Sequence, residues 1–439
     1  MSSSSLFSPS FFLTAAFALA LVLQLLAQVW LLTRQVRHVA QHRGAVPAAF
    51  AQRIPLDAHQ KAADYTLAKA RIGLIQLAWG ALLLLGWTLL GGLNVLHQAL
   101  LGWMAPGLAQ QVVLVAVFAV LSGALELPFA LYRTFVLEQR FGFNQSTLGL
   151  WLGDLLKSTL LGALIGLPLV AAVLWLMQAA GSLWWLWAWA LWTGFQLLLM
   201  WVFPTFIAPL FNKFEPLQDE ALKARVTGLM QRCGFAAKGL FVMDGSRRSA
   251  HANAYFTGLG NAKRVVFYDT LLKQLNADEV EAVLAHELGH FKHRHITKRM
   301  FWVFAASLLG LGLLGWLSQQ PWFYSGLGVA PSLELALGQG GQMQAVALLL
   351  FMLAVPVFTF WLAPLMAHFS RRDEFQADAY AAAQAQPAAL ASALLKLYED
   401  NASTLTPDPL YARFYYSHPP AVERLARLAP SGPAGVGAA

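Results

Sequence analysis

The chain has 439 residues, of which 58% are hydrophobic and only 12% are charged, and its formal net charge is +8. Soluble domains carry about 25% charged residues, so this composition excludes an ordinary soluble protein and indicates a membrane protein. The single cysteine, Cys233, excludes an intrachain disulfide and a cysteine-rich structural zinc site.

Seven apolar stretches are long enough, at about 20 residues each, to cross a bilayer as helices. No Lys or Arg precedes the first stretch, so we expect a retained helix there rather than a secretory signal peptide. A short break near Gly181 separates the fourth stretch from the fifth, which predicts a tight helical hairpin. In chain order the predicted spans are about 10–33, 72–94, 110–132, 158–179, 182–208, 301–318 and 345–367.

All 30 Lys and Arg residues fall in alternate segments outside these spans, namely 34–71, 133–157, 213–299 and 371–427. Positively charged loops stay in the cytoplasm, so we expect the N-terminus outside and the C-terminus in the cytosol. The net charge therefore marks a cytosolic membrane face, and we predict no nucleic-acid partner. Together with the composition, this pattern favours a bacterial inner membrane as the location.

The strongest motif is His286-Glu287-Leu288-Gly289-His290. Two histidines four residues apart share one face of a helix, where they can bind one zinc ion while Glu287 reaches a water molecule on it. Asn276 and Glu279 form a capping signal that favours a helix starting just before the motif. In unrelated helices the same pattern can simply place two histidines on a polar face.

A catalytic zinc site needs a third protein ligand and one open position. Glu374 and Asp378 would share one face of a second helix, so Glu374 could complete the metal site and Asp378 could orient a ligand histidine. Asp373 is a rival ligand, although on a helix it points about 100° away from Glu374. A solvated acidic helix start would explain the same residues without any metal.

We therefore predict one Zn²⁺ ion per chain, bound by His286, His290 and Glu374. Glu287 would act as general base toward a zinc-activated water that hydrolyses a peptide bond.

Contacts to the substrate are predicted from two further segments. His418, which precedes two prolines, could donate a hydrogen bond to the oxyanion. Asn253, Ala254 and Tyr255 lie in a candidate edge strand, which could align an extended peptide through main-chain hydrogen bonds. Taken alone, each of these residues is equally compatible with a purely structural role.

Other titratable residues carry weaker signals. His293 and His295 are interpreted as a basic edge beside the membrane rather than as ligands. Glu126 lies within the third span, where a carboxylate is a functional hypothesis by default, but it could simply line a wet interior. A transporter would show broken helices or paired intramembrane charges, and a decayed, non-catalytic protease scaffold would lack Glu287 or Glu374.

Further segments complete a recognisable set of motifs in order along about residues 130–425. This set resembles the type I CAAX prenyl protease family of membrane zinc peptidases. The matching segments, besides the zinc helix, are Tyr132–Asn144, Pro209–Leu217, Met243–Ser249, Asn253–Gly258, Glu374–Asp378 and His418-Pro419.

The resemblance implies a mainly α, polytopic membrane protein with about seven transmembrane helices that enclose a water-filled chamber, and a cytosolic zincin-like lobe with a short sheet. It implies Glu374 as third ligand, Asp378 as its supporting carboxylate, and Asn253 and His418 as substrate contacts. It also implies peptide or protein substrates, lipidated ones included, at a lipid bilayer. The oligomeric state is not predicted.

The domain organisation follows from the spans and the motifs. We predict a membrane domain of five spans over 1–208 and a peptidase domain over 209–428 that contains the last two spans. Residues 429–439 are predicted to be a disordered tail.

Overall fold

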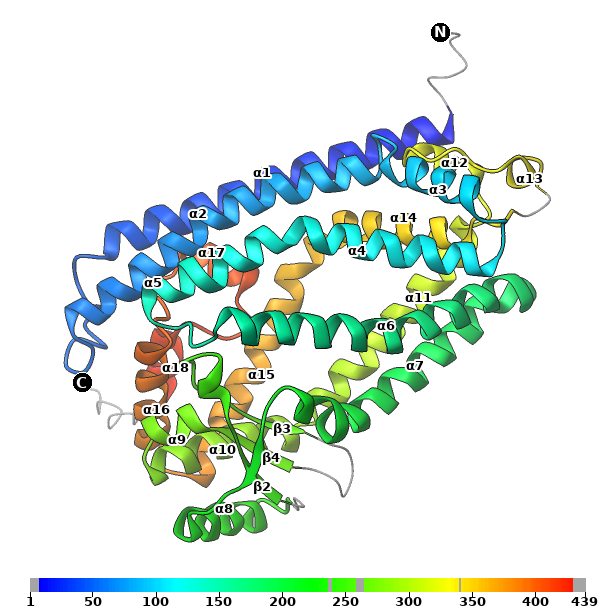
Figure 1. The fold of residues 1–439 in the computed structure, drawn as a ribbon. Helices are drawn as coiled ribbons and strands as arrows, with labels where there is room; N and C mark the ends of the chain where they lie inside the picture. The colour runs from blue at the N-terminus through cyan, green and yellow to red at the C-terminus, as the bar shows by residue number, and fades with distance from the viewer. Residues whose placement is uncertain (1–7, 236–238, 258–263, 339–340, 429–439) are drawn as a thin grey trace, which may run out of the picture.

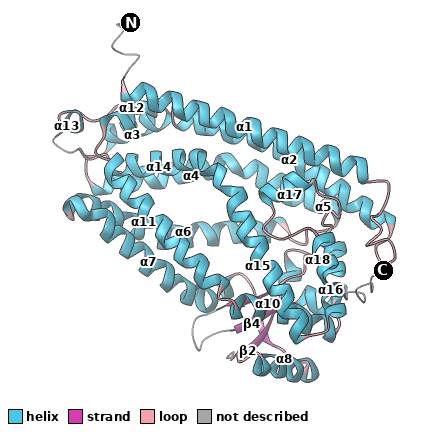
Figure 2. Ribbon diagram, turned by 180° about the vertical axis from the view of Figure 1, so that it is seen from behind, coloured by secondary structure: helices cyan, strands magenta, loops and turns pink. Residues whose placement is uncertain are grey.

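The computed structural model describes residues 8–235, 239–257, 264–338 and 341–428, so the predicted tail at 429–439 lies outside the described residues. These ranges are helical apart from one small sheet (Figures 1 and 2). Long helices run side by side as an elongated bundle, and the sheet with its covering helices lies at one end (Figure 1).

Within the residues that the structure describes, seven helical segments are long and apolar enough to cross a membrane, which confirms the predicted number of spans. They are built on α1 (Pro9–His42), α2 (Leu56–Trp87), α4 (Leu108–Tyr132), α6 (Leu148–Ala179), α7 (Trp184–Val202), α11 (His295–Leu317) and α14 (Gln344–Thr359), the last as part of a helical segment that runs from Gln344 to Gln384. The hairpin between α6 and α7 turns at Gly181, whose φ of 64° is a left-handed conformation that glycine adopts without strain.

The second predicted span, 72–94, is displaced along the chain. Helix α2 starts earlier, at Leu56, and ends at Trp87, before Gly91 with its φ of 79° leads into α3 (Gly92–Trp103). A Cβ atom at Gly92 would lie 2.5 Å from the carbonyl oxygen of Gly86, so this turn requires glycine. Hydropathy locates the apolar part of a helix and does not detect a polar extension of the same helix.

The seventh span does not end where its apolar run ends. After α14 the chain makes a 3-10 turn at Phe360–Leu362 and continues as α15 (Ala363–Gln384). Pro356 and Pro364 flank the turn, and proline removes a backbone donor and clashes with a straight helix. The helix that carries Glu374 is therefore a direct continuation of a membrane span.

The other described helices are shorter. Helix α3 lies beside α12 (Pro321–Gly326) and α13 (Leu333–Ala336) at the end of the bundle nearest the N-terminus (Figure 1). The opposite end holds α8 (Glu220–Arg232), α9 (Asp269–Gln274), α10 (Ala277–Lys292), α16 (Pro387–Asp400), α17 (Pro409–Tyr415) and α18 (Ala421–Leu428). A short helix α5 (Gln139–Phe141) follows a π-helical turn at Arg133–Glu138.

One four-stranded sheet is present in the described part of the chain, with the order β1-β2-β4-β3. β2 (Gly239–Met243) is parallel to β4 (Arg264–Tyr268), while β1 (Phe214–Pro216) and β3 (Ala254–Thr257) pair with them antiparallel. β3 is thus an edge strand, as predicted. The amide of Tyr268 donates to the carbonyl of Asn253 at 3.0 Å, so by antiparallel alternation the main-chain groups of Ala254 and Phe256 face the open edge.

Helix α10 lies in the core of this lobe, in contact with α15, α16, α8 and the edge strand β3. The predicted capping box is confirmed at its start: Asn276 Oδ1 accepts from the amide of Glu279 at 3.0 Å, and the Glu279 carboxylate accepts from the amide of Asn276 at 2.8 Å. Ion pairs tie this lobe to the membrane helices, among them Arg34 with Asp408 at 2.9 Å.

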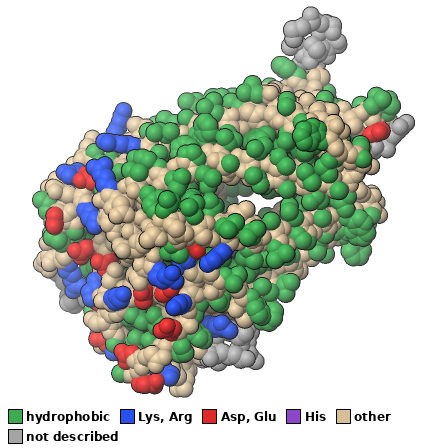
Figure 3. Space-filling model, in the orientation of Figure 1, with side chains coloured by type: hydrophobic (Ala, Val, Ile, Leu, Met, Phe, Trp, Pro, Cys, Tyr) green, Lys and Arg blue, Asp and Glu red, His purple; other side chains and the backbone are tan. Residues whose placement is uncertain are grey.

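The surface divides into two zones (Figure 3). Lys, Arg, Asp and Glu side chains gather at the end that holds the sheet, and hydrophobic side chains cover most of the rest of this face, around an opening in the bundle. Exposed apolar residues such as Leu26, Leu164 and Leu309 belong to the predicted spans. Such a band of apolar surface fits hydrocarbon rather than water.

We predict that Glu279→Gln destabilises the protein by about 1–3 kcal/mol at pH 7, because its buried carboxylate also accepts from Lys396 at 2.7 Å and Ser392 at 2.8 Å. Burial raises the pKa of Glu279, but the bonds from Lys396, Asn276 and Ser392 outweigh burial and leave that pKa below its ordinary 4.5. The stabilisation is therefore full above about pH 4.5 and is lost as the pH falls through the native pKa.

The measurement is the Tm in detergent, followed by tryptophan fluorescence at several pH values. Glu220→Gln is the matched control, because Glu220 pairs with Lys223 on an exposed surface and such pairs contribute little. The prediction would be contradicted if Glu279→Gln had the wild-type Tm at pH 7, or if its Tm stayed lower than that of the wild type by the same amount in acid.

Candidate metal centre

Two helices supply the predicted metal ligands. Helix α10 presents His286 and His290, and α15 presents Glu374. The two helices cross at Gly289, where a Cβ atom would lie 2.8 Å from the Cα and 3.0 Å from the carbonyl oxygen of Ala377. Glycine on one helix and alanine on the other therefore permit a crossing too close for larger side chains.

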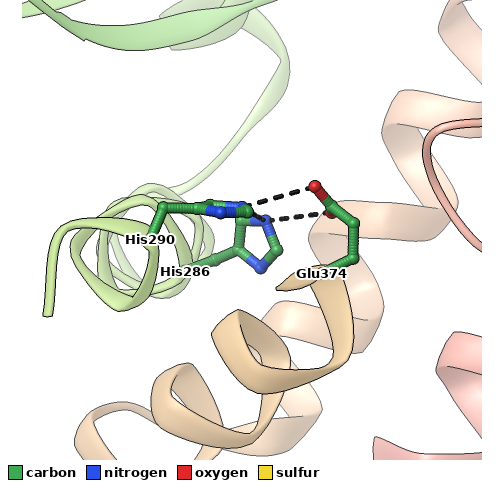
Figure 4. Close-up of side chains that lie close together, drawn as sticks. All are labelled: His286, His290 and Glu374. Carbon is green, nitrogen blue, oxygen red and sulfur yellow. Dashed lines mark hydrogen bonds and ion pairs between the residues drawn. The ribbon is translucent and has the colours of Figure 1, made fainter. Parts of the chain in front are cut away.

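This crossing brings the three predicted ligands together (Figure 4). His286, His290 and Glu374 each offer an atom within 4.8 Å of the other two. His286 Nε2 lies 3.3 Å from His290 Nε2 and 3.4 Å from Glu374 Oε2, and His290 Nε2 lies 3.3 Å from Glu374 Oε1. The rival Asp373 is outside this group; its carboxylate lies 3.5 Å from His295.

The tautomer of His286 is set by a buried carboxylate. Its Nδ1 lies 2.8 Å from Asp378 Oδ1, and because an ionised carboxylate accepts only, Nδ1 carries the proton. The neutral ring then has its lone pair on Nε2, directed at His290 and Glu374. Asp378 thus lies where a carboxylate that orients a metal ligand would lie.

A second set of hydrogen bonds determines the tautomer of His290. His295 Nε2 lies 3.0 Å from Gln376 Oε1 and 3.5 Å from Asp373, both acceptors, so this nitrogen carries a proton. His295 Nδ1 then accepts from His290 Nδ1 at 3.0 Å, which leaves the lone pair of His290 on Nε2. Both imidazoles therefore present Nε2 lone pairs to the same point.

The donor set fits a cation. Glu374 Oε2 is buried and has no hydrogen-bond partner in the described structure, and two nitrogen lone pairs face the same space. Burial lowers the pKa of His286, but the neighbouring carboxylates of Asp378 and Glu374 outweigh burial and raise that pKa to about 9, so a metal ion at this centre would have to displace a proton from Nε2. The centre therefore favours positive charge, and two imidazoles with one carboxylate are a ligand set that zinc prefers.

Glu287 stands beside the centre without a partner of its own. The half-buried side chain makes no hydrogen bond with any described residue, so its carboxylate remains available to an incoming water or substrate. Burial raises the pKa of Glu287 above its ordinary value. A carboxyl group with a raised pKa is a better proton acceptor and donor near neutral pH.

Arg424 is a member of the site that the sequence interpretation missed. This buried guanidinium holds Asp378 in a bidentate pair, with Nε 2.8 Å from Oδ2 and Nη2 2.6 Å from Oδ1. It lies on the same face of α18 as the buried Ala421 and Leu428. An arginine on the apolar face of a short amphipathic helix is a signal that could have revealed it.

His293 and His295 are interpreted above as a basic edge beside the membrane rather than as ligands; His295 is in fact buried, at 3% exposed, and its Nδ1 lies 3.0 Å from His290 Nδ1. His293 is half-buried and stacks on His295, and neither belongs to the ligand group. Glu126 is exposed on α4, far from this group in sequence, and has no hydrogen bond or ion pair among the described residues.

A cavity of about 930 Å³ adjoins the centre and is lined by Asn253 and His418 among others. His418 exposes 62% of its side chain toward the cavity, and its Nε2 lies 3.3 Å from Glu374 Oε1. Partial desolvation by the surrounding protein lowers the pKa of His418. Ala254 is buried. The Tyr255 ring packs near Tyr268 and lines a separate small pocket, so it is not brought to this cavity as a side chain.

Known proteins share both parts of this architecture. A model described as CAAX prenyl protease N-terminal, five membrane helices, matches residues 35–213, and the model of peptidase family M48 matches residues 216–430. The CAAX prenyl protease 1 homolog of Arabidopsis thaliana is 40% identical, over 68% of this chain and 69% of the relative. This chain belongs to the CAAX prenyl protease family within peptidase family M48.

Other members extend the similarity over nearly the whole chain. The human CAAX prenyl protease 1 homolog is 30% identical over 90% of this chain and 91% of its own length. The crystal structure of Ste24p from S. mikatae superposes with a TM-score of 0.85 at 30% identity, and covers 96% of this chain and 99% of that one. The predicted resemblance is confirmed, and the chain is an integral-membrane zinc metalloprotease by family.

We predict that Gly289→Ala weakens metal binding by about 10–100-fold, because the added Cβ must push α15 and Glu374 away from α10. Metal content by mass spectrometry after dialysis against a weak chelator measures the effect. Gly228→Ala in α8 is the control, since its Cβ would meet only the Arg232 side chain at 3.7 Å. Full metal retention by Gly289→Ala would show that the close crossing does not set the ligand spacing.

Proposed function

We propose that His286, His290 and Glu374 hold one zinc ion and that the protein hydrolyses peptide bonds at this centre. The observation that carries the proposal is the convergence of two Nε2 lone pairs and an unpartnered buried carboxylate oxygen on one point. The chemistry supplied by zinc in such a site is Lewis acidity toward water and toward a peptide carbonyl.

The chain's own residues supply the proton transfers. Glu287 accepts the proton of the attacking water and then donates it to the departing amine, and its raised pKa suits both steps. Arg424 fixes Asp378, and Asp378 fixes the ring of His286, so the centre keeps its shape during turnover.

His418 is proposed to stabilise the oxyanion. Its Nδ1 lies 2.9 Å from the hydroxyl of Ser417, which can donate to that nitrogen. The proton of the neutral ring is then on Nε2, on the side of Glu374 and the cavity. A donor held next to the metal ligands can bond the oxygen on which charge develops.

The substrate is proposed to be an extended peptide on the open edge of β3. Asn253 lines the cavity, and the outward main-chain groups of Ala254 and Phe256 can pair with a peptide strand. Tyr255 would then contribute only through its backbone. Because the relatives are named CAAX prenyl proteases, we include lipidated peptides in the proposed substrate class.

We also propose that the protein resides in a bacterial inner membrane with the metal centre on the cytosolic side. The support is the restriction of all Lys and Arg residues to alternate segments, which include the lobe around α10. The relatives named above are eukaryotic, so the proposal of a bacterial membrane rests on charge pattern and composition alone.

For catalysis, we predict that Glu287→Gln lowers kcat for a fluorescence-quenched peptide by about a thousand-fold while the zinc content stays at one ion per chain. Glutamine keeps the size of the side chain and removes its basicity. Glu215→Gln, an exposed change on β1, serves as the control. Unimpaired turnover by zinc-loaded Glu287→Gln would defeat the assignment of the base.

For topology, we predict that green fluorescent protein fused after residue 428 is fluorescent in a bacterial host. Alkaline phosphatase fused after Pro331, beyond α11, should be active, because it would be exported. The reverse pair of results would place the metal centre on the outer side and exclude the proposed orientation.

A further inference from the structure

His418 lies on a short loop, residues 416–420, that joins α17 to α18. Its Nε2 lies 3.3 Å from Glu374 Oε1, so the position of this loop sets the distance between the proposed oxyanion donor and the metal ligands. The loop has no regular secondary structure of its own. Contacts from neighbouring elements must therefore hold His418 in place.

The start of this loop is held by Arg371, on the same helix as Glu374. Arg371 Nη1 donates to the carbonyl of Tyr416 at 2.8 Å and to the carbonyl of Ala412 at 3.2 Å. Among the described residues it has no other hydrogen-bond acceptor and forms no ion pair with a carboxylate. The last carbonyls of a helix lack partners within the helix and carry its negative dipole end, so a guanidinium is well suited to bind them.

The opposite end of α17 is fixed to a membrane helix. Asp408 caps α17, since its Oδ1 accepts from the amides of Leu410 at 3.1 Å and Tyr411 at 2.9 Å. The same carboxylate pairs with Arg34 of α1 at 2.9 Å, and Gln35 of α1 accepts from the amide of Asp408 at 2.7 Å. With its start fixed in this way, α17 can transmit a change at Arg371 only to its last turn and to the 416–420 loop.

A weaker contact holds the other side of His418. The hydroxyl of Tyr398, on α16, donates to the carbonyl of Pro419 at 3.3 Å. Hydrogen bonds from a charged donor are shorter and roughly twice as strong as those between neutral groups. Arg371 therefore makes the stronger of these two contacts with the main chain around His418.

We propose that Arg371 is a positioning residue for His418 and acts through the main-chain carbonyl of Tyr416. This inference rests on the proposed function, to which it adds a residue that touches neither metal nor substrate. Arg371 and Glu374 are three residues apart on α15 and so lie on one face of that helix. One helix thereby sets both the proposed third ligand and the proposed oxyanion donor, and a shift of α15 would move the two together.

The kinetic test uses the full-length, zinc-loaded protein and a fluorescence-quenched peptide. Arg371→Gln should lower kcat by about ten-fold to a hundred-fold, with KM and zinc content little changed, because a displaced donor is lost mainly in the transition state. Arg371→Lys, which keeps a charged donor, should recover most of this loss. Arg372→Gln is the matched control, because Arg372 is the exposed neighbour with the same charge.

A double-mutant cycle separates positioning from a general structural role. If Arg371 acts through His418, adding Arg371→Gln to His418→Ala should cost almost nothing further in kcat. Losses that multiply in the double variant would overturn the proposal. Full activity of His418→Ala would also overturn it, while leaving the peptidase activity intact.

Hydrogen–deuterium exchange of residues 409–418 tests the same contact without turnover. Exchange there should be faster in Arg371→Gln than in the wild type and in Arg372→Gln, while exchange of α10 stays the same. Unchanged exchange of 409–418 in Arg371→Gln would overturn the proposal. Absence of peptide hydrolysis by the wild type would refute the proposed function instead, and the exchange rates would then decide alone whether Arg371 holds the loop.

Discussion

The proposed metal centre depends on the close crossing of α10 and α15 at Gly289 and Ala377. The contacts of Glu374 with His286 at 3.4 Å and with His290 at 3.3 Å favour the group, but they do not by themselves set the distance between the two helices. It comes instead from two small residues, which let the backbones approach until a Cβ on Gly289 would overlap with Ala377. Packing energy from the buried faces of both helices holds together a group of atoms that has no internal partner of its own.

Around this crossing, hydrogen bonds fix the orientation and the tautomer of two imidazole rings, so that each can offer a nitrogen lone pair to a metal ion. Asp378 and Arg424 act on one ring, and His295 with Gln376 act on the other. Both sets of hydrogen bonds use a residue of α15, Asp378 in one and Gln376 in the other, and each adds a residue of a further helix, Arg424 of α18 or His295 of α11. The buried charges are balanced only as a complete set, which makes any one of them costly to remove.

Much of this structure could be predicted because its signals are local. The seven spans follow from transfer free energy over about 20 residues, and the His286–His290 pair follows from helix periodicity. The same holds for the cap at Asn276 and for the edge strand that begins at Ala254. The shared helix face of Glu374 and Asp378 could be predicted for the same reason. Their approach to α10, however, was inferred from the chemistry of a zinc site rather than from any local pattern.

The remainder depends on tertiary contacts that no local pattern contains. Arginine and histidine usually lie on protein surfaces, and nothing in the sequence around Arg424 and His295 shows that tertiary packing buries them. The true start of α2 and the continuation of the seventh span beyond its apolar run were missed, because polar helical turns have no hydropathy signal. The direction of the Tyr255 ring depends on its neighbour Tyr268, which lies on β4, a strand that was not predicted from the sequence.

The continuity of the seventh span with α15 has a consequence for biosynthesis. The ribosome delivers His286 and His290 first, then α11, the segment that leads to α14, and finally Glu374 and Arg424. Glu374, the proposed third ligand, therefore reaches His286 and His290 only after the sixth and seventh membrane helices have been made and have folded back on each other. A nascent or prematurely terminated chain lacks a complete site, so the peptidase is assembled at the membrane and nowhere earlier.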